Sequence, residues 1–207
     1  TLKNKNKPGQ PIDDWVDLYH KGSNTAELIQ QGYKDGILDK EDTNHPSLKY
    51  YSPPKKDQLL AKGIKFFWFG YYHKWIPQEN FYYASKNYNF NVNPDGRSEG
   101  TYNKYASLDD ATDPLHYHMA YIKFGIGRAT SDASHEIRDN HLTREEGVQL
   151  VKKFDHEPPT NSMQITLDYL NIKEENLNDI IDAFREKRSN LWKKTNEGWE
   201  LKYAVYK

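Results

Sequence analysis

The stretch Lys123-Phe-Gly-Ile-Gly-Arg-Ala-Thr-Ser-Asp132 lies between two segments that predict helices, and it contains the first candidate for a binding site. Its two glycines allow the backbone to turn N–H groups toward a ligand. The hydroxyl and acidic residues that follow are typical of a helix N-terminus, where unpaired N–H groups attract anions. Together with the side chains of Lys123 and Arg128, the stretch predicts a site for a phosphate or carboxylate group.

The same stretch has a simpler interpretation as a connection between two helices. Gly127 would end one element, and Ser131 or Thr130 would cap the next. Both interpretations place one helix before the stretch, over about 107–121, and another after it, over 131–140.

Capping patterns extend the helical prediction in both directions. Ser107 and Asp110 resemble an acidic variant of the capping box, and Pro114 is expected to disturb the helix that follows. Thr143-Arg-Glu-Glu146 is a full capping box with an apolar helix face after it. Helices are also predicted over 12–20, 23–31, 55–62, 77–88, 162–170 and 173–189.

Two segments predict a small β component. Ile64-Lys-Phe-Phe-Trp-Phe69 is short, apolar and aromatic, which is typical of a buried strand. Residues 192–203 contain Glu197-Gly198 between apolar residues and predict a hairpin. The expected fold class is therefore mostly α with a small β component.

The composition limits the classes of function. The 207 residues suffice for one large or two small domains, and the net charge of −1 provides no basic field for nucleic acid. No apolar run approaches the ~20 residues that cross a bilayer, and no secretory signal is visible. We therefore expect no nucleic-acid or membrane partner and a cytoplasmic location. The chain has no cysteine, which excludes disulfides within it, and its 16 tyrosines predict a tyrosine-rich pocket.

Further candidate residues occur beside glycines and after the predicted strand. Arg97-Ser-Glu-Gly-Thr-Tyr102 brings the cation Arg97 and the acid Glu99 together, either as a substrate clamp or as an exposed ion pair of little energetic value. Lys74 follows the predicted strand, where ligands commonly meet α/β sheets, although it could simply anchor the next helix.

The histidines give little reason to expect a metal site. On a helix, His116 and His118 would point about 200° apart, so they could share an ion only on a strand. Three aspartates lie near them, but the spacing fits no common zinc pattern, and we expect no metal. The chain also lacks the Gly-x-Ser-x-Gly, Walker and His-Glu-x-x-His motifs.

Several segments follow one another in an informative order. They are Phe67-Trp-Phe-Gly-Tyr-Tyr-His-Lys-Trp75, Glu79-Asn80, Arg97-Ser-Glu-Gly-Thr-Tyr102, Tyr121-Ile-Lys-Phe-Gly-Ile-Gly-Arg-Ala-Thr-Ser-Asp-Ala-Ser134, Glu136-Ile-Arg138 and Leu142-Thr-Arg-Glu-Glu146. In this order they resemble the C-terminal part of the N-acetyl sugar amidotransferases of bacterial surface-polysaccharide or flagellin-sugar synthesis. That family resembles the PP-loop ATP pyrophosphatase superfamily, which has an adenine-nucleotide alpha-hydrolase fold.

The resemblance implies a reaction that converts an N-acetyl group of a sugar or nucleotide sugar into an acetamidino group. ATP would activate the amide oxygen by adenylation. Ammonia from a glutaminase partner, delivered through a channel subunit, would then displace AMP. Such a site needs cations for phosphates or a sugar carboxylate, and polar groups for hydroxyls. The matching segments offer these candidate substrate- and phosphate-binding residues: Lys74, Arg97, Glu99, Lys123, Gly125, Gly127, Arg128, Ser131, Asp132 and Arg138.

One motif of the superfamily, the phosphate loop Ser-Gly-Gly-x-Asp-Ser, is absent from the chain. We therefore expect a C-terminal piece of such an enzyme. Its parts would be a linker or cut end over 1–11, the end of the PP-loop α/β domain with flanking helices over 12–88, and a helical C-terminal domain over 89–207. ATP and Mg²⁺ would bind the parent protein, with no cofactor held tightly by this piece, which alone would not hydrolyse ATP.

Two other functions stay open. A PP-loop enzyme that modifies RNA would share the fold, although the near-neutral charge disfavours it. A non-catalytic helical module could instead dock the ammonia-supplying partner through the face of residues 160–207 that carries Arg185, Lys187, Arg188 and Trp192. The alternative for this face is a solvated surface with Trp192 packed inward.

Overall fold

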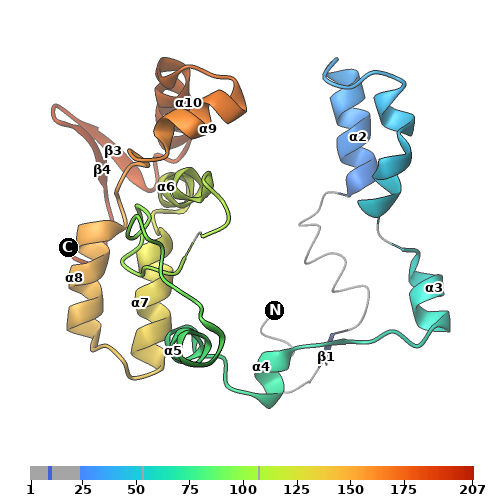
Figure 1. Cartoon of the computed structure of the whole chain (residues 1–207). Coiled ribbons are helices and arrows are strands. Elements are labelled where there is room, and N and C mark those ends of the chain that lie inside the picture. The colour runs from blue at the N-terminus through green and yellow to red at the C-terminus, as the bar shows by residue number, and fades with distance from the viewer. Residues whose placement is uncertain (1–8, 11–23, 53, 107) are drawn as a thin grey trace. The chain divides into compact units, whose positions relative to one another are not determined.

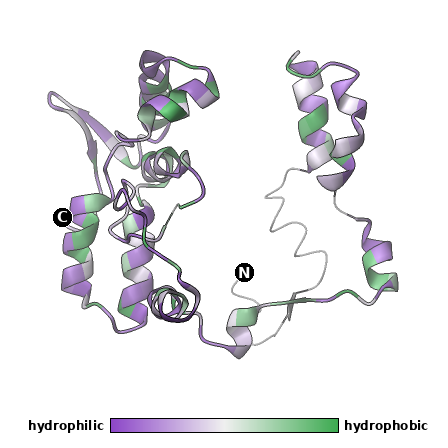
Figure 2. Cartoon of the chain, in the orientation of Figure 1, coloured by the Kyte–Doolittle hydropathy of each residue, from purple (hydrophilic) through white to green (hydrophobic). Residues whose placement is uncertain are grey.

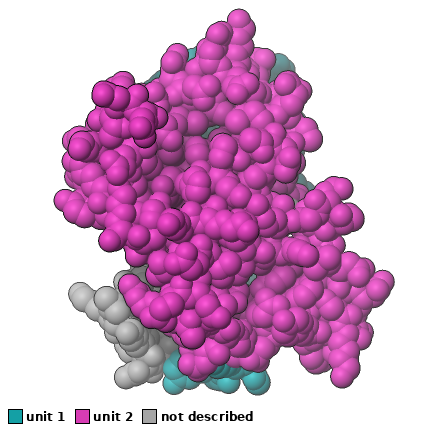
Figure 3. Space-filling model, turned by 90° about the vertical axis from the view of Figure 1, so that its left-hand side faces the viewer, with its two compact units in different colours: residues 1–75 teal, residues 76–207 magenta. Residues whose placement is uncertain are grey.

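The computed structural model describes residues 9–10, 24–52, 54–106 and 108–207. The chain divides into two compact units, 1–75 and 76–207 (Figures 1 and 3). The predicted helix over 12–20 and most of the predicted linker over 1–11 lie outside the described residues. The boundary after Trp75 places the predicted helix over 77–88 in the second unit.

The first unit is built from short helices. Helix α2 begins at a capping box in which Asn24 Oδ1 accepts the Glu27 N–H at 2.9 Å, while the Glu27 carboxylate accepts the Asn24 N–H at 3.3 Å. Among the described residues of this unit, the helical elements are α2 (Thr25–Lys34), η2 (Asp42–Asn44), η3 (Pro46–Tyr50), α3 (Lys56–Ala61) and α4 (Phe69–Tyr72).

The prediction of a buried strand over 64–69 is wrong. Strand β2 covers only Phe66–Phe67 and pairs antiparallel with β1 (Gly9–Gln10). The side chain of Phe67 is 51% exposed, and Phe69, which is 62% exposed, already begins α4. The described part of this unit contains no parallel sheet, so it provides no strand end at which Lys74 could meet a ligand.

The second unit contains the longer helices and the C-terminal hairpin (Figure 1). Helices α7 and α8 pack side by side as a helical hairpin, and α10 packs on α6. The elements are α5 (Pro77–Tyr88), α6 (Asp113–Phe124), α7 (Arg128–Arg138), α8 (Arg144–Phe154), α9 (Met163–Leu170), α10 (Glu174–Lys187), β3 (Trp192–Thr195) and β4 (Gly198–Leu201).

Helix α6 differs from its prediction at both ends. Pro114 lies in the first turn and therefore helps to begin the helix instead of disturbing it, because a first-turn residue needs no N–H partner. The predicted cap Ser107 lies outside the described residues. The helix continues to Phe124 and ends at Gly125, whose φ of 72° strains residues with a side chain.

Two local predictions are confirmed. Thr143 and Glu146 form the capping box of α8, with the Thr143 N–H donating to Glu146 Oε2 at 2.9 Å and the Glu146 N–H donating to Thr143 Oγ1 at 3.2 Å. Strands β3 and β4 form an antiparallel hairpin in which Thr195 is opposite Gly198. The described residues are thus mostly helical with two small antiparallel sheets.

The core of the second unit is formed by residues of α6, α9, α10 and the hairpin. Figure 2 shows that hydrophobic and hydrophilic residues alternate along these helices. Trp192 is only 4% exposed, and its Nε1 donates to the carbonyl of Ile122 at 2.8 Å. The expectation that Trp192 packs inward is therefore confirmed. Within the described ranges, no helix combines the length and apolar character that crossing a membrane requires.

Candidate functional site

The anion site predicted at the N-terminus of α7 is occupied by the chain's own Asp155. Its carboxylate accepts the Gly127 N–H at 2.8 Å, the Thr130 N–H at 2.9 Å and the Thr130 hydroxyl at 2.8 Å. The N–H of Ala129, in the same turn, donates to the carbonyl of Gly100 at 2.9 Å. Asp155 is 3% exposed. Three of the amides that were expected to receive a phosphate, those of Gly127, Ala129 and Thr130, are therefore already paired inside the fold.

This pairing also corrects the predicted start of α7. The helix begins at Arg128, before Ser131, and no side chain of its own caps it. Ser131 is instead an exposed first-turn residue. Gly127 is required by crowding, since a Cβ there would lie 2.8 Å from Asp155 Oδ1 and 2.9 Å from the Asp155 carbonyl oxygen. Gly125 is the residue at which α6 ends.

The predicted cation Arg128 is paired with the predicted acid Asp132. Arg128 Nε donates to Asp132 Oδ1 at 2.9 Å, and the guanidinium lies 5.2 Å from the centre of the Tyr117 ring. The other carboxylate oxygen of Asp132 accepts the Thr101 hydroxyl at 2.6 Å and the Asn103 amide at 3.1 Å. Asp132 therefore holds the 101–103 segment against α7.

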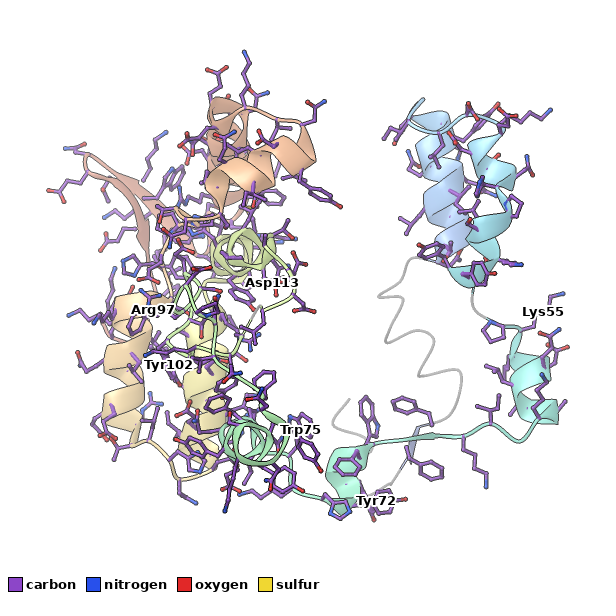
Figure 4. The ribbon with its side chains drawn as sticks, in the orientation of Figure 1. Lys55, Tyr72, Trp75, Arg97, Tyr102 and Asp113 are labelled. Atoms are coloured by element: carbon purple, nitrogen blue, oxygen red, sulfur yellow. The ribbon has the colours of Figure 1, made fainter. Side chains whose placement is uncertain are left out.

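Arg97 forms a structural clamp, not the expected pair with Glu99. Its guanidinium binds Glu157 through two hydrogen bonds of 2.6 and 2.7 Å and lies 4.4 Å from the centre of the Phe154 ring. Figure 4 labels Arg97. The Gly100 N–H donates to the same carboxylate at 3.1 Å. A two-bond fork of this kind fixes geometry as well as charge.

Glu99 is buried and has its own partners. Its Oε1 accepts the Asn161 N–H at 2.7 Å and the Thr160 hydroxyl at 3.0 Å. Together with the clamp at Arg97, this ties the 97–101 segment to the residues that follow α8.

Three predicted site residues remain: Lys123, Arg138 and Lys74. The Lys123 ammonium lies 5.5 Å from the centre of the Phe184 ring and 5.7 Å from that of Phe124. Arg138 is exposed in the last turn of α7, and Lys74 is an exposed residue of the first unit.

A cavity of about 560 Å³ gathers polar and aromatic side chains elsewhere in the second unit. This volume lies within the usual range of ligand pockets, roughly 300–1,000 Å³. Its walls come from α5, the connection between α5 and α6, α7, and the turn before α8. The lining residues are Gln78, Phe81, Tyr82, Val92, Tyr102, Asn103, Lys104, Tyr105, Glu136 and His141.

Hydrogen bonds and ring stacking set the geometry of this tyrosine cavity. The Tyr102 hydroxyl donates to Glu136 Oε1 at 3.1 Å, and the Tyr105 hydroxyl donates to Gln78 Oε1 at 3.2 Å. The rings of Phe81 and Tyr105 stack with centroids 4.7 Å apart and planes 13° from parallel. Figure 4 marks Tyr102 on the connection between α5 and α6.

Burial controls the protonation of the cavity. It raises the pKa of Tyr105 to about 12 and also raises the pKa of Tyr102, so both hydroxyls remain donors at neutral pH. Burial likewise raises the pKa of Glu136, against the opposing effect of the Tyr102 hydrogen bond. At the turn before α8, His141 Nε2 lies 3.4 Å from Glu79 Oε1.

The predicted residues Arg128 and Asp132 support the wall of this cavity rather than line it. Asp132 holds Thr101 and Asn103, the neighbours of Tyr102. The side-chain oxygen Oδ1 of Asn103 in turn accepts the backbone N–H groups of residues 105 and 106, at 3.3 and 2.8 Å. The cavity wall is thereby fixed by α7.

Nothing in the described part of the chain brings three or more His, Asp or Glu side chains close enough to hold a metal ion. His116 and His118 both lie on α6. His118 is buried, its Nδ1 lies 3.1 Å from the carbonyl oxygen of Glu157, and burial lowers its pKa.

Sequence reasoning missed Glu136, Gln78 and Phe81, because the cavity combines segments that are far apart along the chain. The one signal for it was the abundance of tyrosine, since three tyrosines line the cavity. Tyr102 and Glu136 both occur in segments that carry the family resemblance.

Residues 99–206 match the family described as LPS biosynthesis protein WbpG-like, C-terminal domain. No curated protein matches the chain. The match covers slightly more than half of the 207 residues and includes Tyr102, Tyr105 and Glu136. The chain therefore belongs to the WbpG-like family of LPS biosynthesis proteins and carries its C-terminal domain.

Proposed function

We propose that this chain supplies the sugar-binding part of an ATP-dependent amidotransferase in lipopolysaccharide biosynthesis. The reaction would convert an N-acetyl group of a sugar or nucleotide sugar into an acetamidino group. Membership of an LPS biosynthesis family supports the pathway. The tyrosine cavity, with its aromatic faces beside the Tyr102–Glu136 pair, is the observation that supports a sugar ligand.

The cavity has the two kinds of surface that a sugar needs. A sugar ring has apolar C–H faces, which pack on aromatic rings such as those of Phe81 and Tyr82. Its hydroxyl and amide groups need convergent hydrogen-bonding partners. The hydroxyl of Tyr102, the carboxylate of Glu136 and the imidazole of His141 line the same cavity and can provide such partners.

ATP does not fit the anion site that the sequence suggested. Asp155 already holds the amides at the start of α7, and a triphosphate brought there would meet this carboxylate. The Ser-Gly-Gly-x-Asp-Ser phosphate loop is absent from the sequence. We therefore assign ATP and Mg²⁺ to residues outside these 207, and the supply of ammonia to a glutaminase partner. This chain would bind and orient the sugar.

Calorimetric titration with the methyl glycoside of a 2-acetamido sugar, and with its nucleotide-linked form, tests the proposal. Tyr82 and Tyr83 provide a matched pair, because both are 61% exposed on α5 but only Tyr82 lines the cavity. Tyr82→Ala should weaken binding several-fold, since an aromatic contact contributes roughly 0.5–1.5 kcal/mol. Tyr83→Ala should bind like the wild type. Absence of binding, or equal loss in both variants, would contradict the proposal.

A further inference from the structure

Glu136 has fewer hydrogen-bonding partners than four other buried or half-buried carboxylates of the second unit, those of Asp132, Asp155, Glu157 and Glu99. Asp132, Asp155, Glu157 and Glu99 each accept at least two hydrogen bonds from cations, hydroxyls or backbone amides. Among the described residues, the carboxylate of Glu136 accepts one hydrogen bond, from the Tyr102 hydroxyl, and forms no ion pair.

The surroundings of Glu136 favour a positively charged guest. Burial has the largest effect and opposes the ionisation of Glu136. The charges of Asp132 and Asp139 also oppose it, whereas His141 favours it. Lys104 also lines the cavity but is an exposed residue. A carboxylate in such a place is stabilised by a ligand that donates N–H groups or carries positive charge.

The aromatic rings around Glu136 indicate which kind of cation would bind beside it. Phe81, Tyr102 and Tyr105 surround the same cavity, and aromatic faces attract planar delocalised cations. An amidinium group has this shape, and it presents N–H donors in the fork that a carboxylate accepts. The neutral acetamide has the same outline but carries no charge.

We propose that Glu136 is a specificity-determining residue that binds the nitrogen-bearing group of the sugar, so that the cavity prefers the acetamidinium form to the acetamide form. The inference rests on the proposed function, which supplies the conversion of a neutral amide into a cation. The carboxylate is placed to stabilise the positive charge as it develops on that group.

The test compares two methyl glycosides that differ only in carrying a 2-acetamidino or a 2-acetamido group. Titration of the chain at about pH 8, far above the ordinary glutamate pKa of about 4.3, should show that the acetamidino glycoside binds at least tenfold more tightly than the acetamido glycoside. Glu136→Gln should abolish this preference while keeping the oxygen that accepts from Tyr102. The exposed Glu145 on α8 gives the control, because Glu145→Gln changes charge without touching the cavity.

The pH provides a second measurement. The preference of the wild type should fall as the pH drops through the raised pKa of Glu136, and it should be independent of pH in Glu136→Gln. Equal binding of both glycosides by the wild type, or a preference that survives in Glu136→Gln, would overturn this inference alone. Failure of both glycosides to bind would instead refute the proposed sugar site itself.

Discussion

Asp155→Ala is the change that most sharply separates the structural role of the α7 N-terminus from a ligand-binding role. The substitution removes a carboxylate that accepts two backbone N–H groups and one hydroxyl. It leaves the donors of Gly127 and Thr130 without a protein partner at the end of a helix, where the positive end of the helix dipole lies.

The expected loss of stability is about 3 kcal/mol. Replacing an N-cap acceptor by alanine costs roughly 0.5–2 kcal/mol, and each hydrogen bond to a charged group contributes roughly 1.5–3 kcal/mol. Gly127 and Thr130 are only partly buried, so water can hydrogen-bond to the freed donors and offset part of the lost free energy. For a domain of this size, 3 kcal/mol lowers the melting temperature by about 10 °C. Asp155→Asn, which retains one carbonyl oxygen, should lose less.

Thermal denaturation with and without inorganic phosphate provides the assay. If Asp155 fills the anion site, phosphate should stabilise Asp155→Ala and have little effect on the wild type, compared with potassium chloride at the same ionic strength. Stabilisation of the wild type as large as that of the variant would refute the reasoning, because it would mean that the amides remain open to anions. A melting temperature unchanged by Asp155→Ala would refute it as well.

The remaining predictions concern crowding, the core and the cavity. Gly127→Ala should lower the free energy of unfolding, measured by urea denaturation, by about 2 kcal/mol, because its Cβ would meet the Asp155 carbonyl. Gly147→Ala should cost less, since its Cβ would meet the movable end of the Ile137 side chain. Equal losses in the two variants would contradict this prediction. Trp192→Phe should cost about 1–2 kcal/mol by leaving a buried carbonyl of α6 unpaired, and an unchanged urea midpoint would argue against that bond. Glu136→Gln should be at least as stable as the wild type near neutral pH. Folding raises the pKa of Glu136, so the wild type loses stability as the pH rises from the ordinary glutamate pKa through the raised pKa, where the folded state holds a proton that the unfolded state has released. This gain should vanish below the ordinary value, and a destabilised Glu136→Gln at neutral pH would assign Glu136 a structural role.

Local sequence patterns correctly predicted the structural features that depend on residues close together in the chain. The Thr143–Glu146 capping box, the hairpin at Gly198 and the mainly helical character all depend on residues within a few positions of one another, and all are confirmed. Pro114 was misjudged because its effect depends on where the helix starts.

The failures have long-range causes. The α7 N-terminus is capped by Asp155, which is remote in sequence, so no local rule could distinguish an open anion site from a filled one. The aromatic residues of 64–69 have the composition of a buried strand, but among the described residues β2 has only the two-residue strand β1 to pair with. The cavity joins four separate segments, and only its tyrosine content could be anticipated.

The central claim is that ligands bind the tyrosine cavity and not the loop at the start of α7. Two-dimensional NMR of the labelled chain, titrated with the 2-acetamido glycoside, tests it directly. We expect the largest amide shifts at Tyr102–Tyr105, Glu136 and Tyr82. Shifts centred on Gly125–Thr130, with the cavity unaffected, would contradict the account.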